Sequence, residues 1–109
     1  MNQFTKNLLV GSVFVAGVLN ASRVFAHFPL MSCWLEAKKV VCQSGYSDGS
    51  EAVDYAVEMF DYDDNLIARS ITDKRSIAEF EMPADDFYLV FDAGHESPVE
   101  VDVVEIEEK

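Results

Sequence analysis

Apolar and polar residues alternate in short runs along residues 30–106, and this alternation limits the possible fold more than any other feature of the sequence. No segment repeats its apolar residues with the 3.6-residue period of an amphipathic helix. Short strands that recur every 8–12 residues or so, with turn residues between them, are typical of an antiparallel sandwich. We therefore predict an all-β, seven-stranded antiparallel sandwich, with strands at 30–36, 39–44, 53–60, 66–71, 77–82, 87–92 and 99–106.

Within these strands the alternation assigns the faces. In the run 53–60, Val53, Tyr55, Val57 and Met59 share one face, which we expect to be buried. In the run 77–82, we expect Ala78, Phe80 and Met82 to point inward. In the run 99–106 the alternation of apolar and polar residues is interrupted near Val103, which would fit a β-bulge.

Residues 1–26 have the composition of a targeting segment. Lys6 provides a positive charge, and the run Leu8–Leu19 is apolar and uncharged. Val24 and Ala26 suit the −3 and −1 positions of a signal peptidase site, so we expect residues 1–26 to be a signal peptide. Cleavage after Ala21 is the competing prediction. The apolar run is shorter than the roughly 20 residues that a membrane span needs, so we expect a periplasmic or secreted domain, residues 27–109, that does not itself cross a membrane.

The charge of this domain excludes several classes of partner. The whole chain has 8 basic and 20 acidic residues and a net charge of −12. Residues 1–26 contain two of the basic residues and no acidic one, so residues 27–109 have a net charge of −14. Phosphate backbones and anionic lipids would repel such a surface, so we expect no nucleic-acid binding. Cations and basic proteins are the expected partners.

The two cysteines are predicted to form a disulfide. The runs 30–36 and 39–44 flank a two-residue turn at 37–38, so the numbers of opposed residues should add to 75, as those of Cys33 and Cys42 do. They also fall at a non-hydrogen-bonded pair, where Cα atoms approach to about 4.5 Å. Export to an oxidising compartment favours the same pairing. The alternative, a cysteine-based metal site, is weak because neither cysteine belongs to a C-x-x-C pair.

The two histidines are the candidate metal ligands. Cleavage after Ala26 would make His27 the first residue, and its α-amino group and imidazole Nδ1 could then chelate one metal ion. His95 would add a second imidazole if both residues lie at one end of the sandwich. Such a nitrogen-rich site suits divalent Ni or Cu. The alternatives are a frayed terminus at His27 and a turn hydrogen bond at His95.

Several short motifs resemble those of one known family. The segments are GYSDGSEAV at 45–53, VEMFD at 57–61, ITD at 71–73 and DAGH at 92–95. Together they resemble the carboxypeptidase-regulatory-like (transthyretin-like) β-sandwich, and more narrowly the small periplasmic components of nickel- and cobalt-type metal uptake systems. The resemblance implies a transthyretin-like or immunoglobulin-like sandwich in which His27 and His95 match the family's two histidines.

The two histidines together with this resemblance imply a metal-binding accessory protein for uptake or delivery of Ni(II), Co(II) or Cu(II), with a membrane metal transporter component as its partner. We expect no enzymatic activity, because two histidines do not allow a convincing Ser/His/Asp set. The alternative is a metal-free acidic β-sandwich that binds a basic partner through its acidic face or an edge strand. A copper oxygenase with an N-terminal His is a more distant third.

Overall fold

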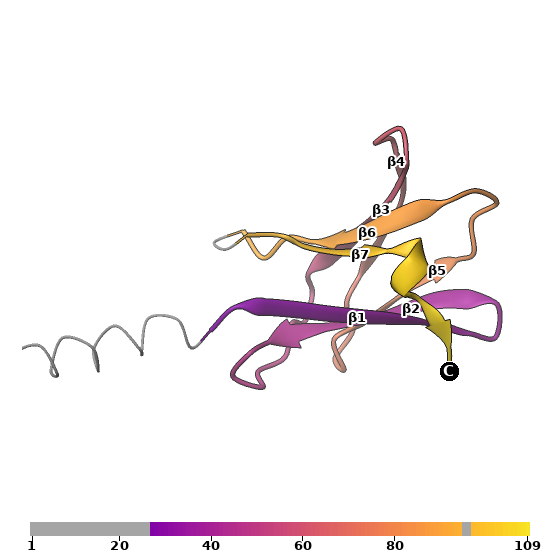
Figure 1. Cartoon of the computed structure of the whole chain (residues 1–109). Helices are drawn as coiled ribbons and strands as arrows, with labels where there is room; N and C mark the ends of the chain where they lie inside the picture. The colour runs from indigo at the N-terminus through magenta and orange to yellow at the C-terminus, as the bar shows by residue number, and fades with distance from the viewer. Residues whose placement is uncertain (1–26, 95–96) are drawn as a thin grey trace, which may run out of the picture.

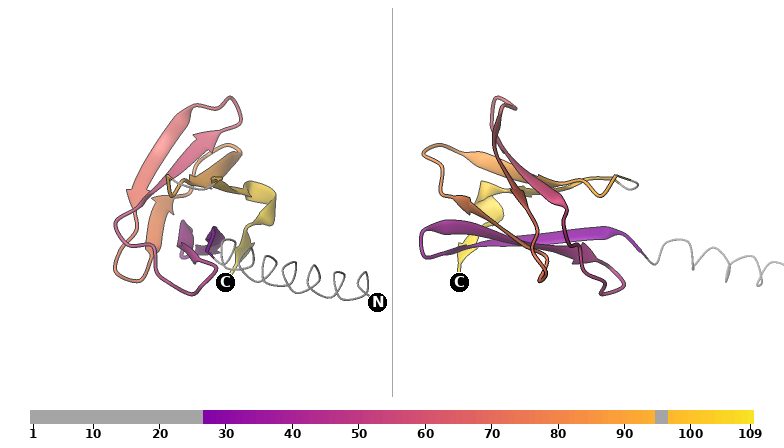
Figure 2. Two further views of the ribbon diagram at one scale, coloured as in Figure 1. Left: turned by 90° about the vertical axis from the view of Figure 1, so that its left-hand side faces the viewer. Right: turned by 180° about the vertical axis from the view of Figure 1, so that it is seen from behind.

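The computed structural model describes residues 27–94 and 97–109, so the predicted signal peptide and His95 lie outside the described residues. The chain forms two four-stranded sheets that face each other as a sandwich (Figure 1), with the layers seen end-on and from behind in Figure 2. One sheet has the order β5-β2-β1-β8, and the other has the order β4-β3-β6-β7. The strands are β1 (Pro29–Glu36), β2 (Lys39–Tyr46), β3 (Ala56–Asp61), β4 (Leu66–Ile71), β5 (Ile77–Glu81), β6 (Phe87–Phe91), β7 (Val99–Asp102) and β8 (Glu107–Glu108).

The first hairpin has the predicted register. Cys33 lies opposite Cys42, and the two form a disulfide with a Cα–Cα distance of 4.1 Å. The turn residues Ala37 and Lys38 both have positive φ, 50° and 65°. Left-handed backbone at both positions is typical of the two-residue hairpin turn whose twist matches that of its strands. The disulfide and the all-β sandwich are therefore confirmed.

The number of strands was predicted wrongly: the described chain has eight, not seven. The run 99–106 does not continue as one bulged strand, because β7 ends at Asp102 and a 3₁₀ turn, η1 (Val103–Glu105), follows. The Asp102 side chain accepts a hydrogen bond from the Val104 amide and so caps this turn. The turn takes the chain to the other sheet, where β8 pairs parallel with β1.

Two smaller predictions also fail. The third strand begins at Ala56 rather than at residue 53, because Asp54 has φ = 63°, outside the extended region. Met82 was expected to point inward but is 46% exposed. The pairing of β5 with β2 ends at Glu81, which lies opposite Lys39, the first residue of β2. Met82 therefore has no residue of β2 opposite it.

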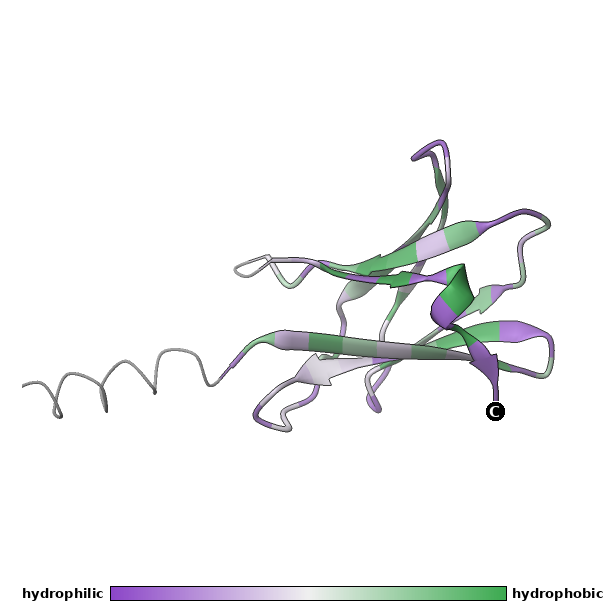
Figure 3. Ribbon diagram, in the orientation of Figure 1, coloured by the Kyte–Doolittle hydropathy of each residue, from purple (hydrophilic) through white to green (hydrophobic). Residues whose placement is uncertain are grey.

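The core lies between the inner faces of the two sheets. Figure 3 shows hydrophobic residues along the strands, with hydrophilic residues concentrated in many of the turns at the ends of the sandwich. Val57, Met59, Ala78 and Phe80 are buried, as the alternation predicted. The core cluster is Val40, Cys42, Tyr46, Ala52, Val57, Met59, Ala78, Phe80, Phe87, Leu89, Phe91 and Val101.

Candidate functional site

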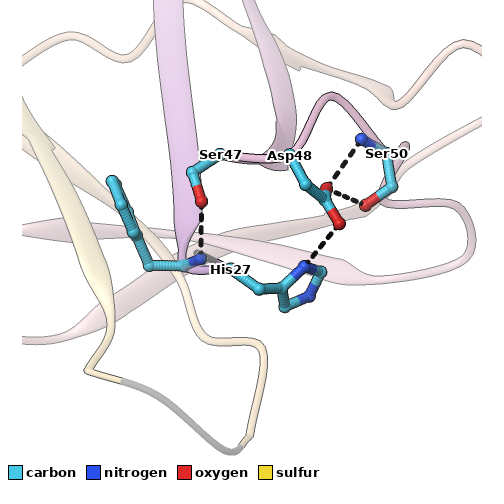
Figure 4. Close-up of polar contacts among 5 residues, drawn as sticks. His27, Ser47, Asp48 and Ser50 are labelled. Atoms are coloured by element: carbon cyan, nitrogen blue, oxygen red, sulfur yellow. Dashed lines mark hydrogen bonds and ion pairs between the residues drawn. The ribbon is translucent and has the colours of Figure 1, made fainter. Parts of the chain in front are cut away.

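His27 lies just before β1, opposite the turn that follows β2. Its Nδ1 atom is 2.9 Å from Oδ2 of Asp48, and the two side chains are 44% and 46% exposed (Figure 4). The hairpin register explains the pairing, because residue numbers that add to 75 lie opposite each other in β1 and β2. The sum for positions 27 and 48 is also 75. The strand pairing that joins the two cysteines therefore also aligns this histidine with an aspartate.

The turn after β2 holds Asp48 in a fixed orientation. Its Oδ1 atom accepts hydrogen bonds from the Ser50 amide, at 2.9 Å, and from the Ser50 hydroxyl, at 2.6 Å (Figure 4). Gly49 supplies the positive φ, 89°, that the tight turn requires. The Phe28 amide donates to Oγ of Ser47, at 2.9 Å, and the Ser47 amide donates to the Phe28 carbonyl, at 2.8 Å. The segment beside His27 is therefore tied to this turn and is not a frayed end.

An aromatic platform supports the imidazole. The rings of His27 and Tyr46 are stacked, with centroids 4.5 Å apart and an interplanar angle of 16°. Tyr46 packs edge-on against Tyr55 and Phe91, at centroid distances of 6.4 and 6.2 Å. Burial, and then the neighbouring Tyr55 phenol, raise the pKa of Tyr46 to about 12, so its phenol is neutral at physiological pH. The platform joins the start of β1 to the end of β6.

The connection between β6 and β7 leaves from this same end of the sandwich (Figure 1). Phe91 is the last residue of β6, and Asp92 accepts a hydrogen bond from the Gly94 amide, at 2.9 Å, where the connection begins. His95 itself lies outside the described residues. Its predicted partnership with His27 therefore stays a prediction. The described residues show only that the start of β1 and the end of β6 lie at the same end of the sandwich (Figure 1).

The described donors at this end are one imidazole and one carboxylate. Across residues 27–94 and 97–109, no group of three or more His, Cys, Asp or Glu side chains is arranged to hold a metal ion. His27 and Asp48 fit a divalent transition ion as a nitrogen and an oxygen donor, but they do not complete a site by themselves. Further donors would have to come from groups that the structure does not describe, such as the amino group that processing creates or the side chain of His95.

The contact with Asp48 also limits how His27 can bind metal. Chelation by the α-amino group and Nδ1 needs the nitrogen that lies 2.9 Å from Asp48. An ion bound in this way would have to replace the hydrogen at that contact. The Asp48 carboxylate would then lie beside the ion, where its negative charge would favour binding.

Sequence reasoning missed Asp48 as a member of this site. The register of the hairpin could have identified it. Opposed residues of β1 and β2 have numbers that add to 75, as Cys33 and Cys42 do, and the numbers of His27 and Asp48 also add to 75. The predicted pairing of residues was not extended beyond the ends of the predicted strands, 30–36 and 39–44. Both strands are longer than predicted, starting at Pro29 and ending at Tyr46, and this extension brings His27 next to the turn.

Replacing Asp48 by asparagine should lower stability in a pH-dependent way. Hydrogen bonds from Ser50, and then from His27, hold the pKa of Asp48 well below its usual value of 3.8. A lowered pKa in the folded state adds stability above the ordinary pKa, and this contribution disappears as the pH falls through the lowered one. Thermal unfolding should therefore show Asp48→Asn to be less stable than the parent at neutral pH, with the difference narrowing steadily as the pH falls below about 4.

Asp85→Asn, in the exposed β5–β6 turn, is the control for this experiment. It removes the same charge from a different part of the surface, so its effect should not follow the same pH profile. An Asp48→Asn difference that is constant from neutral to acidic pH would contradict the role of the carboxylate charge.

Comparisons of the chain with protein-family models, with curated proteins and with solved structures found no match. In the part of the chain that the structure describes, no helix is long and apolar enough to cross a membrane.

Proposed function

We propose that this protein is an extracytoplasmic metal-binding accessory protein, which binds one Ni(II), Co(II) or Cu(II) ion as cargo at the His27 end of the sandwich. The observation that carries the proposal is the pairing of the His27 imidazole with the Asp48 carboxylate at 2.9 Å, on an exposed end of the molecule. A nitrogen donor beside an ionised carboxylate attracts a divalent cation. Exposure suits a cargo that must be passed on.

The complete donor set in this proposal has three nitrogen atoms. Cleavage after Ala26 supplies the α-amino group of His27, its Nδ1 atom supplies the second donor, and His95 supplies the third. Support comes from Phe91, the last residue of β6, because its ring packs against Tyr46, the ring on which His27 is stacked. The chain leaves β6 toward His95 from this point. The stacking of His27 on Tyr46 supports it further, because a ring held against a rigid platform loses less entropy when it binds an ion.

The cellular location in the proposal is outside the cytoplasm, with a membrane metal transporter component as the receiving partner. The Cys33–Cys42 disulfide supports this location, because such bonds persist mainly in oxidising compartments. The net charge of −14 for residues 27–109 would raise the local concentration of cations near the site.

Native mass spectrometry of the exported protein tests the proposal. The intact mass identifies the first residue, and titration with Ni(II), Co(II) and Cu(II) should show about one tightly bound ion per chain. His27→Ala and His95→Ala should each weaken binding by at least about tenfold, because each removes nitrogen donors from one site. Asp48→Asn should weaken binding less, because it leaves the nitrogen donors in place.

Asp85→Asn is again the matched control, because it removes one negative charge from the turn before β6, whereas His27 packs beside the end of β6. It should leave metal affinity unchanged. If the parent protein binds none of the three ions at micromolar concentration, the proposal is wrong. It is equally wrong if His27→Ala binds as tightly as the parent, since the ions would then be held by the general acidic surface.

A further inference from the structure

The outer face of the sheet β4-β3-β6-β7 has a row of side chains that the core does not use. Strand pairing aligns Leu66 of β4, Phe60 of β3, Tyr88 of β6 and Asp102 of β7 across the sheet. Met59, Leu89 and Val101, the chain neighbours of Phe60, Tyr88 and Asp102, are buried, so these three side chains face away from the core. The register of β3 and β4 shifts between Met59 and Phe60, and Leu66 beyond this shift is 52% exposed. The rings of Phe60 and Tyr88 are stacked, with centroids 5.4 Å apart. The row therefore runs from an apolar end at β4 to a carboxylate at β7.

Two tyrosine–aspartate hydrogen bonds fix the acidic end of this row. The Tyr62 hydroxyl, in the β3–β4 turn, donates to Asp102 of β7 at 2.7 Å. The Tyr88 hydroxyl, on β6, donates in the opposite direction to Asp64 of the turn, also at 2.7 Å. These bonds raise the pKa of Tyr62 and of Tyr88 to about 12, so both phenols remain protonated donors at physiological pH.

A hollow of about 620 Å³ lies at this acidic end. Its lining contains four carboxylates and two phenol rings and no basic side chain: Tyr62, Asp64, Tyr88, Glu100, Asp102 and Glu105. Among the described residues, none of these four carboxylates forms an ion pair. Aromatic faces beside uncompensated negative charges are a favourable environment for an ammonium or guanidinium group.

We propose that this face, which we define as Leu66, Phe60, Tyr88 and the hollow, binds an extended lysine- or arginine-containing segment of a partner protein. The basic side chain would enter the hollow, and an apolar side chain would rest on Leu66, which is 52% exposed. From β4 to β7 there are three strand spacings, or about 14 Å. An extended segment rises about 3.3 Å per residue, so the apolar and the basic residue should be about four positions apart.

The negative charge of this face favours a basic protein segment over a second copy of the chain or a nucleic acid. A second copy of the chain would bring its own net charge of −14 onto an acidic face. Nucleic acid would be repelled in the same way. A basic protein segment is attracted by the hollow and is also able to cover the apolar end of the row, which a small polycation would leave exposed. The inference does not depend on metal binding, because none of these residues belongs to the His27 site.

The variant that tests the proposal removes charge without loosening the turn. Glu100 and Glu105 line the hollow but take no part in the two tyrosine–aspartate bonds. Glu100→Gln combined with Glu105→Gln therefore lowers the negative charge of the hollow by two and keeps those bonds. Glu51→Gln combined with Glu79→Gln is the matched control, because it makes the same change in net charge on exposed residues elsewhere.

The experiment is an NMR titration of the ¹⁵N-labelled protein, produced from the full-length sequence, with the acetylated and amidated peptide LSVSKSVSK at about 20 mM salt. Shifts should concentrate at Tyr62, Tyr88, Glu100 and Asp102. The Glu100/Glu105 variant should bind at least about fivefold more weakly, and the control variant should change affinity by less than about twofold. Chelators should have no effect.

Three outcomes would overturn the inference. Equal weakening by both variants would mean that only net charge matters. Shifts spread over both sheets would mean that the peptide has no defined site. Spermine that binds to the same residues as tightly as the peptide would mean that the hollow recognises small polycations and that the apolar end of the row contributes nothing.

Discussion

Replacing Phe91 by alanine should lower the free energy of unfolding by about 3–5 kcal/mol, the usual cost of deleting a large buried aromatic side chain. Phe91 is 0% exposed. Its ring packs edge-on against Tyr46 and Tyr55, at centroid distances of 6.2 and 5.8 Å. Removing it would leave a cavity between the sheets and would take away support from the platform on which His27 is stacked.

Urea unfolding followed by circular dichroism measures this loss. Phe28→Ala is the control, because Phe28 is 48% exposed and its truncation should change stability by no more than about 0.5 kcal/mol. A small domain has limited stability in reserve, so Phe91→Leu is the milder variant if the alanine protein does not fold. It should cost about 1–2 kcal/mol. A Phe91→Ala protein as stable as Phe28→Ala would contradict this account of the core.

Removing the disulfide should lower the free energy of unfolding by about 2–3 kcal/mol. Cys33 and Cys42 are nine residues apart, so the bond closes a short loop, and the chain-entropy model gives a stabilisation of this size for such a loop. For a domain of this size, the expected fall in Tm is on the order of 10–20 °C. Cys33→Ala combined with Cys42→Ala is the right variant, because Cys42 is 0% exposed and a serine would bury a hydroxyl there.

Chemical reduction provides the control for this prediction. The parent protein should be destabilised by a reducing agent, and the double-alanine variant should not respond to it. An oxidised parent no more stable than the variant would show that hydrogen bonding and packing fix the β1–β2 hairpin without the bond. In that case the alignment of His27 with Asp48 would not depend on the disulfide either.

The local features of this fold could be predicted from the sequence because they depend on neighbours in the chain. The alternation of side chains, the two-residue turn at Ala37 and Lys38 and the Cys33–Cys42 register all follow from strand geometry. The end of β7 could not be predicted in this way. Val103 and Val104 favour a strand, but the Asp102 cap and the pairing of β8 with β1 take the chain out of its sheet.

The two candidate sites differ in the same way: one depends on a hairpin that is local in the chain, and the other depends on strands that are distant in the chain. The acidic charge, the disulfide and the all-β class were determined by the sequence alone. The contact between His27 and Asp48 continues the hairpin register that the sequence predicted, but only the structure showed that the hairpin extends far enough to bring the two side chains together. The bonds from Tyr62 to Asp102 and from Tyr88 to Asp64 join positions 40 and 24 residues apart. They require β3, β6 and β7 to be adjacent, and no local pattern specifies that order. Only the burial of both inner faces in one core selects it, so the tertiary structure alone decided where the aromatic row and its acidic hollow lie.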